Sequence, residues 1–156
     1  MTVLTCSEWA TAKRTRLRHI RPGDLFFFTV PGRGFGSGRI VARVSLGHTA
    51  EIFDPITVEP PRQFDPDTLT AHPPVVIDSY SLLDRGREGD YRILAHDSEF
   101  DPGGRYDSVF FAFGAGPNRT RVDILGNRTA ISEDEARHLP RYTPLGDARI
   151  QNLVGT

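Results

Sequence analysis

The chain has 156 residues, a length typical of one domain that can bury a sizeable core. With 38% hydrophobic and 25% charged residues it lacks the composition of a disordered chain, and a single cysteine excludes an intrachain disulfide framework and a cysteine zinc site. It has no apolar run of about 18 residues and no signal-peptide core, so we expect a cytoplasmic protein without a membrane segment.

The formal net charge is −1, but the charges are spread unevenly along the chain. Residues 1–43 contain eight basic and two acidic residues, a net charge of +6, whereas residues 44–107 contain five basic and thirteen acidic residues, a net charge of −8. Residues 108–156 are nearly neutral. The folded protein is therefore predicted to have one basic and one acidic face.

Residues 1–14 are interpreted as an N-terminal arm with a short helix that Ser7 could cap. Trp9 is expected to anchor the arm by packing on the domain, and an exposed contact for a partner is the alternative. Residues 15–20 alternate between apolar and basic side chains. This pattern predicts an edge strand whose arginines face solvent.

Residues 15–54 as a whole are predicted to form a β-meander. Its first buried strand is Leu25–Val30, an uninterrupted apolar run typical of a strand buried on both faces, and further strands are expected at 40–44 and 50–54. A phosphate-binding loop is excluded, because no Gly-x-Gly-x-x-Gly occurs and a strand follows where a helix is required. The alternating glycines are instead expected to supply positive φ angles, a bulge or room for an aromatic ring: Gly32, Gly34, Gly36 and Gly38.

The second half of the chain is predicted to contain further strands followed by short helices. Residues 55–74 form a proline-rich loop, with one helical turn near Asp67–Leu69. Strands are expected within residues 75–125, at 75–80, 91–95, 109–113 and 121–125. Residues 126–156 hold the helices: Ser132 and Glu135 form a capping box for a helix over 132–139, and Asp147 could cap a last helix that ends near Val154.

These elements together predict a single mostly β domain over residues 1–156, of the α+β class. The architecture is expected to be a twisted antiparallel sheet or an SH3-like, partly open barrel with one or two short helices.

No motif in the sequence indicates a catalytic site, a cofactor or a metal. The acidic loop 96–104 does not match a calcium-binding loop, because Pro102 replaces the required glycine and Ser108 replaces the final glutamate. His96 beside these acids is expected to be a hydrogen-bonded structural histidine, with a base or a ligand as the alternative. We therefore expect a protein that is not an enzyme and that binds no metal or cofactor.

The first third of the chain resembles the immunity protein 26 family of bacterial polymorphic toxin systems. The residues that carry the resemblance are Gly23, Asp24, Phe26, Phe28, Phe35, Gly36, Gly38, Arg39, Ile40 and Phe53. The resemblance implies a mostly β domain that binds and neutralises a cognate toxin, commonly a nuclease. It implies no catalytic residues and leaves the oligomeric state open.

The partner surface is inferred from charge, since acidic side chains could cover the basic cleft of a nuclease and speed the encounter. The expected partner-binding residues lie in the acidic segment: Asp78, Asp84, Glu88, Asp90, Asp97, Glu99 and Asp101.

An alternative function is that of a β-barrel domain that acts on RNA or DNA, either as a nucleic-acid-binding protein or as a MazF-like RNA-acting enzyme. The opening strands also resemble the MazF/PemK-type endoribonuclease toxins, although Ile40 follows Arg39 where those proteins have proline. In this alternative, the less favoured of the two, the nucleic-acid contacts are Arg16, Arg18, Arg33 and Arg39.

Overall fold

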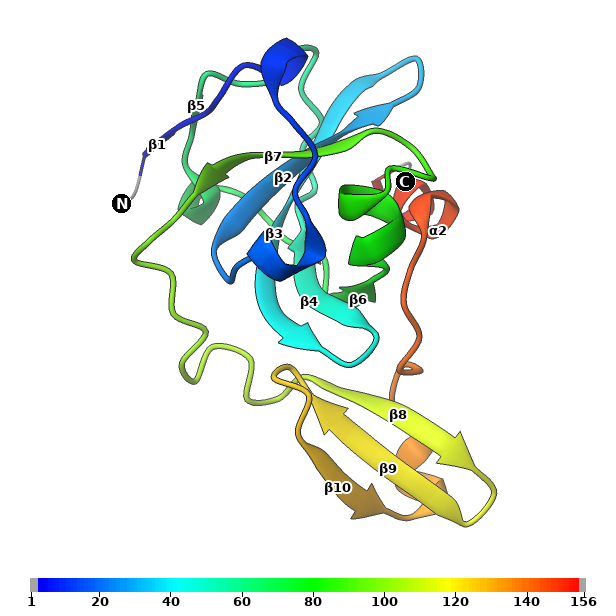
Figure 1. Cartoon of the computed structure of the whole chain (residues 1–156). Helices are drawn as coiled ribbons and strands as arrows, with labels where there is room; N and C mark the ends of the chain where they lie inside the picture. The colour runs from blue at the N-terminus through cyan, green and yellow to red at the C-terminus, as the bar shows by residue number, and fades with distance from the viewer. Residues whose placement is uncertain (1–2, 155–156) are drawn as a thin grey trace.

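A computed structural model describes residues 3–154, which form three antiparallel sheets and a few short helices (Figure 1). The largest sheet has five strands in the order β6-β4-β3-β2-β7. These strands are β2 (Asp24–Val30), β3 (Gly34–Val44), β4 (Gly47–Ile52), β6 (Val75–Ile77) and β7 (Tyr91–His96). No closed barrel forms within the described residues. The prediction of a mostly β, α+β fold built on a twisted antiparallel sheet is confirmed.

Strand β2 is buried on both faces, as its apolar sequence predicted. Phe26 and Phe28 face a core that also contains Ile150 of the C-terminal helix α2 (Asp147–Val154). Leu25 and Phe27 face a second core on the opposite side of the sheet, beneath the N-terminal arm. Three phenylalanines and a leucine of β2 therefore fill the cores on both faces of the sheet.

The alternating glycines of β3 make room for these rings. Phe28 lies opposite Gly36 and Phe26 lies opposite Gly38 in the antiparallel pair of β2 and β3. A Cβ atom at Gly36 would lie 2.4 Å from the Phe28 ring, and one at Gly38 would lie 2.3 Å from the Phe26 ring. Both distances are far inside van der Waals contact. The expected role of these two glycines, space for an aromatic ring, is confirmed.

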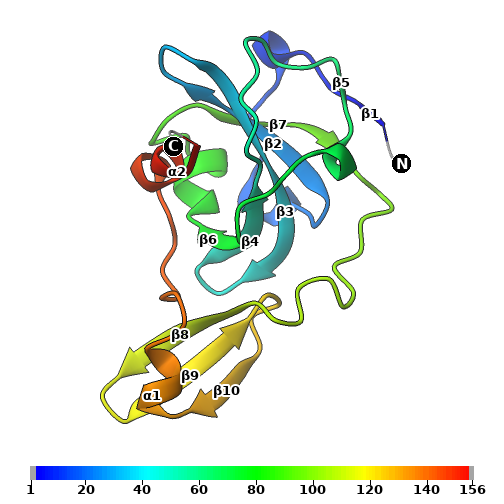
Figure 2. The same ribbon diagram turned by 180° about the vertical axis from the view of Figure 1, so that it is seen from behind.

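A three-stranded sheet forms a lobe beside the main sheet (Figures 1 and 2). Its strands are β8 (Phe110–Ala115), β9 (Asn118–Asp123) and β10 (Arg128–Ile131). Phe111 and Val122 from this lobe pack with Tyr142 against Val44 and Val76 of the main sheet. The third sheet is a short pair that ties the N-terminal arm to the proline-rich loop, β1 (Leu4–Thr5) with β5 (Gln63–Phe64).

Residues 15–20 do not form the predicted edge strand. They contain a 3-10 turn, η2 (Leu17–His19), in which His19 N–H donates to the Arg16 carbonyl at 2.8 Å. The edges of the main sheet are occupied by β6 and β7, and η2 packs instead on the π-helical turn η4 (Tyr80–Asp84). The strand predicted over 75–80 is correspondingly shorter, because β6 ends at Ile77.

The short helices agree with the sequence in position and differ in length. Glu135 N–H donates to Ser132 Oγ at 3.1 Å, as the capping box predicted, but the helix α1 (Glu133–Ala136) ends before residue 139. The proline-rich loop has its predicted turn as η3 (Pro66–Thr68). Ser7 does not cap the first turn, η1 (Trp9–Thr11), because Glu8 occupies the N-cap position.

Candidate functional site

A chain of arginine-lined depressions follows residues 14–21 across the surface of the main sheet and η4. One depression of about 340 Å³ is lined by Arg14, Arg16, Asp84 and Arg85. The next, of about 240 Å³, shares Arg16 and Asp84 with the first and adds Leu17, Arg18 and Arg43. A third, of about 390 Å³, shares Arg18 with the second and adds His19 and Arg21. Because the depressions share residues, we treat them as one feature and call it the arginine groove.

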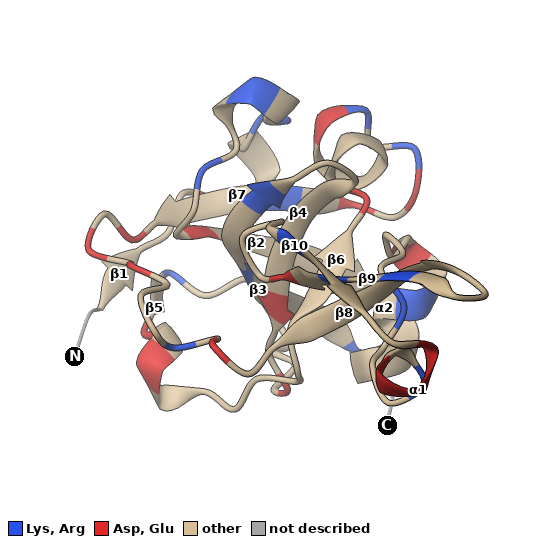
Figure 3. Cartoon of the chain, turned by 90° about the horizontal axis from the view of Figure 1, so that it is seen from below, with Lys and Arg blue, Asp and Glu red and all other residues tan. Residues whose placement is uncertain are grey.

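The arginine groove combines residues from three separate parts of the chain. Arg43 comes from the end of β3, Arg85 follows η4, and the other arginines come from the segment around η2. The charge-coloured view shows basic residues gathered around η2 and beside the loop that follows η4 (Figure 3).

Hydrogen bonds fix the groove segment on η4. Leu17 N–H donates to Asp84 Oδ2 at 2.8 Å, and Arg14 Nη1 donates to the Arg85 carbonyl at 2.8 Å. The turn η4 is closed by Arg85 N–H, which donates to the Tyr80 carbonyl at 2.8 Å. Hydrogen bonds between side chains and backbone therefore hold the groove together, and Asp84 contributes by binding the Leu17 N–H.

Three arginines of the groove have no partner of opposite charge. Within residues 3–154, neither an ion pair nor a side-chain hydrogen bond involves Arg16, Arg18 or Arg43, and all three are exposed. Burial, and after it the positive charge of Arg43, lowers the pKa of His48 beneath the groove to about 4. Unpaired guanidinium groups can each donate several hydrogen bonds to an anion, so the groove is suited to a carboxylate- or phosphate-bearing partner.

An aromatic side chain stands next to the groove. Tyr80 is 38% exposed, and the guanidinium carbons of Arg85 and Arg87 lie 5.2 Å and 5.8 Å from its ring centroid. Arg85 Nε also donates to the Tyr80 hydroxyl at 2.8 Å. Arginine and tyrosine are the residue types enriched where proteins bind one another tightly.

The nucleic-acid candidates predicted from the sequence divide into two groups. Arg16 and Arg18 lie together in the groove. Arg33 lies in the turn between β2 and β3, at the opposite end of β3 from Arg43, where it donates to the Val154 carbonyl at 3.0 Å. Arg39 is only 3% exposed and cannot make the expected surface contact.

Arg39 belongs to a buried polar cluster. Its Nη2 lies 2.9 Å from Glu51 Oε1, and the hydroxyl of Tyr106 donates to the same oxygen. The guanidinium carbon also lies 4.5 Å from the ring centroid of Phe100. Burial, followed by this hydrogen bond, raises the pKa of Tyr106 to about 12. The cluster attaches the loop after β7 to β3 and β4.

Strand β7 divides the acidic candidates, four of which precede it in the chain and three of which follow it. Its two ends are about 20 Å apart for a six-residue strand, and Asp78 directly follows β6 at the other edge of the sheet. Most of their carboxylates already accept hydrogen bonds within the chain. The backbone donors are Ser81 to Asp78, Leu17 to Asp84, Asp147 to Glu88, Glu99 to Asp97 and Gly103 to Asp101, and the side chain of Arg92 pairs with Asp90. Glu99 is exposed, and its carboxylate has no such bond within residues 3–154. The fold therefore does not bring these seven acids into one patch.

Two histidine pairs, one buried and one partly exposed, have the residue types of acid–base chemistry. His48 Nδ1 lies 2.6 Å from Ser79 Oγ, but both residues are fully buried. His96 Nδ1 lies 2.8 Å from Asp24 Oδ1, and the other oxygen of Asp24 accepts the Arg21 N–H at 2.8 Å. His96 is therefore hydrogen-bonded to the first residue of β2, as a structural histidine would be.

The groove adds Arg14, Arg43 and Arg85 to Arg16 and Arg18, and only the fold brings Arg43 and Arg85, which are distant in sequence, next to residues 14–18. Within the described residues, no three His, Cys, Asp or Glu side chains are grouped so that they could share a metal ion. None of the helices in residues 3–154 has the length and apolar character needed to cross a bilayer. Comparison with protein-family models, with curated proteins and with solved structures found no match.

Proposed function

We propose that this chain is a cytoplasmic immunity protein, which neutralises a cognate bacterial toxin by binding it and catalyses no reaction itself. The toxin is expected to be a nuclease, the class implied by the resemblance of residues 20–54. The arginine groove is the proposed contact surface. The observation that carries the proposal is the accessible row of unpaired arginines beside Tyr80.

The chemistry of the groove matches a carboxylate-rich surface. Metal-dependent nucleases commonly hold their metal ions with carboxylate oxygens, which an arginine side chain can bind in a bidentate manner. Arg16, Arg18 and Arg43 are free to make such contacts without breaking an ion pair of this chain. This differs from the acidic surface expected from sequence, most of whose carboxylates accept hydrogen bonds from the chain itself.

The proposal is tested with the toxin domain encoded by the neighbouring gene. We expect the two proteins to co-purify as a stoichiometric complex and the toxin to lose activity in proportion to the added protein. If no complex forms with any toxin domain encoded nearby, the proposed function is rejected.

The same groove favours nucleic-acid binding as a second candidate function. Exposed arginines that contact phosphates release counterions, so the affinity would fall steeply as salt rises. A gel-shift series over increasing salt separates the two candidate functions. Salt-sensitive binding of RNA or DNA, without inhibition of the toxin, supports nucleic-acid binding. If the protein retards no nucleic acid at the lowest salt, nucleic-acid binding is rejected.

A further inference from the structure

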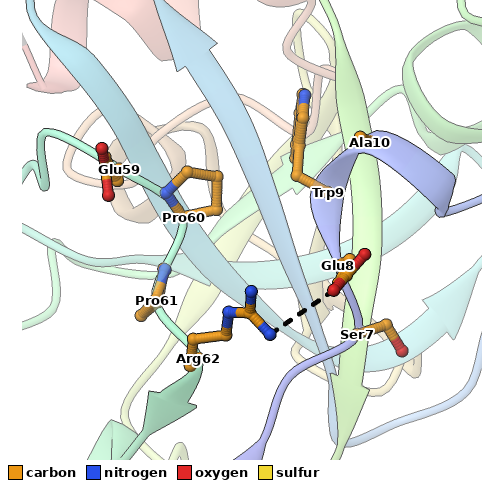
Figure 4. A pocket seen from close by; sticks show the side chains of 8 residues that line it. All are labelled: Ser7, Glu8, Trp9, Ala10, Glu59, Pro60, Pro61 and Arg62. Carbon is orange, nitrogen blue, oxygen red and sulfur yellow. Dashed lines mark ion pairs between the residues drawn. The ribbon is translucent and has the colours of Figure 1, made fainter.

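A second hollow, which shares no lining residue with the arginine groove, lies between the N-terminal arm and the proline-rich loop. It has a volume of about 410 Å³, and its lining includes Glu8, Trp9, Glu59, Pro60 and Arg62. Figure 4 shows the Trp9 and Pro60 rings on opposite walls, with the Glu8–Arg62 ion pair crossing between them. We call this hollow the tryptophan slot.

Both walls of the tryptophan slot are fixed by backbone hydrogen bonds. The Cys6 N–H donates to the Arg62 carbonyl at 2.8 Å, which joins the two walls at one end. Phe35 and Thr57 exchange hydrogen bonds of 2.7 Å and 2.9 Å, which fix the proline-rich loop to β3 just before Glu59. The slot therefore needs little rearrangement to accept a ligand, which lowers the entropic cost of binding.

The indole ring of Trp9 is held in place from behind. The Arg92 guanidinium carbon lies 4.4 Å from the ring centroid, and Arg92 Nη1 donates to the Trp9 carbonyl at 2.5 Å. Asp90 accepts two hydrogen bonds from Arg92, at 2.9 Å and 3.1 Å, and balances its charge. Phe35 contacts the indole edge-on at a centroid distance of 5.0 Å. These contacts orient the ring, and Pro60 stands on the other side of the slot.

The charges around the tryptophan slot are predominantly acidic. Within residues 3–154, the Glu59 carboxylate makes no hydrogen bond or ion pair. Glu8 is paired with Arg62 at 3.5 Å, but the two side chains are 58% and 81% exposed, so the pair is weak and a ligand can replace it. Glu8 lies next to Trp9, and the Glu59 carboxylate lies beyond Pro60 in Figure 4, where no partner within the described residues holds it. These two carboxylates favour a cationic ligand, and a planar guanidinium can both stack on the indole and donate to a carboxylate.

We propose that the tryptophan slot binds the guanidinium group of an arginine side chain presented by a peptide segment of another protein. The guanidinium stacks between the rings of Trp9 and Pro60, and the exposed, unpaired Glu59 side chain turns toward the slot to accept its hydrogen bonds. This site goes beyond toxin neutralisation and does not depend on the arginine groove.

Trp9 is the only tryptophan in the chain, so its fluorescence reports directly on the slot. The protein is titrated with the capped peptide Gly-Arg-Gly and with matched peptides that carry Lys, Gln or Pro in the central position. We expect a saturable fluorescence change with the arginine peptide, weaker binding of the lysine peptide and no saturable change with the glutamine or proline peptides.

Two variants locate the site. Glu59→Gln is expected to weaken binding of the arginine peptide about tenfold, the loss of one charge-assisted hydrogen bond. Glu133→Gln, an exposed change on α1, should leave the binding curve unchanged. The proposal is overturned if the arginine peptide gives no saturable change, if the glutamine or proline peptide binds as tightly, or if Glu59→Gln has no effect.

Discussion

Single residues in the core carry charges that must stay paired. Arg39 and Glu51 are both buried, and each depends on the other for compensation of its charge. Removing one member of a buried pair leaves an uncompensated charge, which costs more than the pair contributes.

Replacing Arg39 with methionine is therefore expected to lower the free energy of unfolding by about 3–5 kcal/mol. The double variant Arg39→Met/Glu51→Met should lose less than the sum of the two single changes, because no unpaired charge remains. Denaturant unfolding of the four proteins measures this coupling. Additive losses would show that the two side chains do not compensate each other.

His48 makes stability depend on pH. Its pKa is lowered from about 6.5 to about 4, chiefly by burial, so the unfolded chain takes up a proton at a higher pH than the folded one. The contribution of His48 to the free energy of unfolding, about 3 kcal/mol, is present above pH 6.5 and is lost as the pH falls towards 4. Plotted against pH across this range, the free energy of unfolding should change less steeply in His48→Gln than in the unmodified protein. His19→Gln, at an exposed position, should keep the original slope. An unchanged slope in His48→Gln would contradict the assignment.

At the scale of elements, the sequence predicted the strands and helices that are determined by a pattern within a few residues. Strand β2 followed from its apolar run and the start of α1 from Ser132, because burial and capping act over a few residues. The turn η2 could not be predicted, since the sheet edges are taken by strands distant in sequence and Leu17 bonds to Asp84. Strand β10 was not predicted either, because residues 128–131 show no apolar alternation and the first three of them are exposed.

The pairing of β2 with β3 predicts the effect of one added methyl group. In Gly38→Ala the new Cβ would meet the Phe26 ring at 2.3 Å and the Glu51 carbonyl oxygen at 2.6 Å. Although alanine normally suits a strand better than glycine, overpacking should lower the free energy of unfolding by about 1–3 kcal/mol. Gly104→Ala is the control, because its Cβ would meet only the flexible side chain of Asp107. Equal stability of the two variants in denaturant would refute this role of Gly38.

At the scale of the whole molecule, the charge pattern of the sequence anticipated the basic surface only in part. Arg16 and Arg18 could be named because they are close in sequence and alternate with other side chains. Arg43 and Arg85 join them only when β3 and η4 pack beside η2. The acidic segment was predicted to form one surface, but β7 separates its two halves and backbone amides bind most of its carboxylates.

The central claim is that the arginine groove is the surface that neutralises the toxin. The most direct measurement is an inhibition titration of the cognate toxin with the Arg16→Glu/Arg18→Glu variant. Two reversed charges in the contact should weaken inhibition by at least about thirtyfold while the unfolding midpoint stays the same. The control Arg137→Glu/Arg141→Glu, at exposed positions beyond β10, makes the same change in net charge and should inhibit like the unmodified protein. Full inhibition by the groove variant, or an equal loss in the control, would contradict the claim.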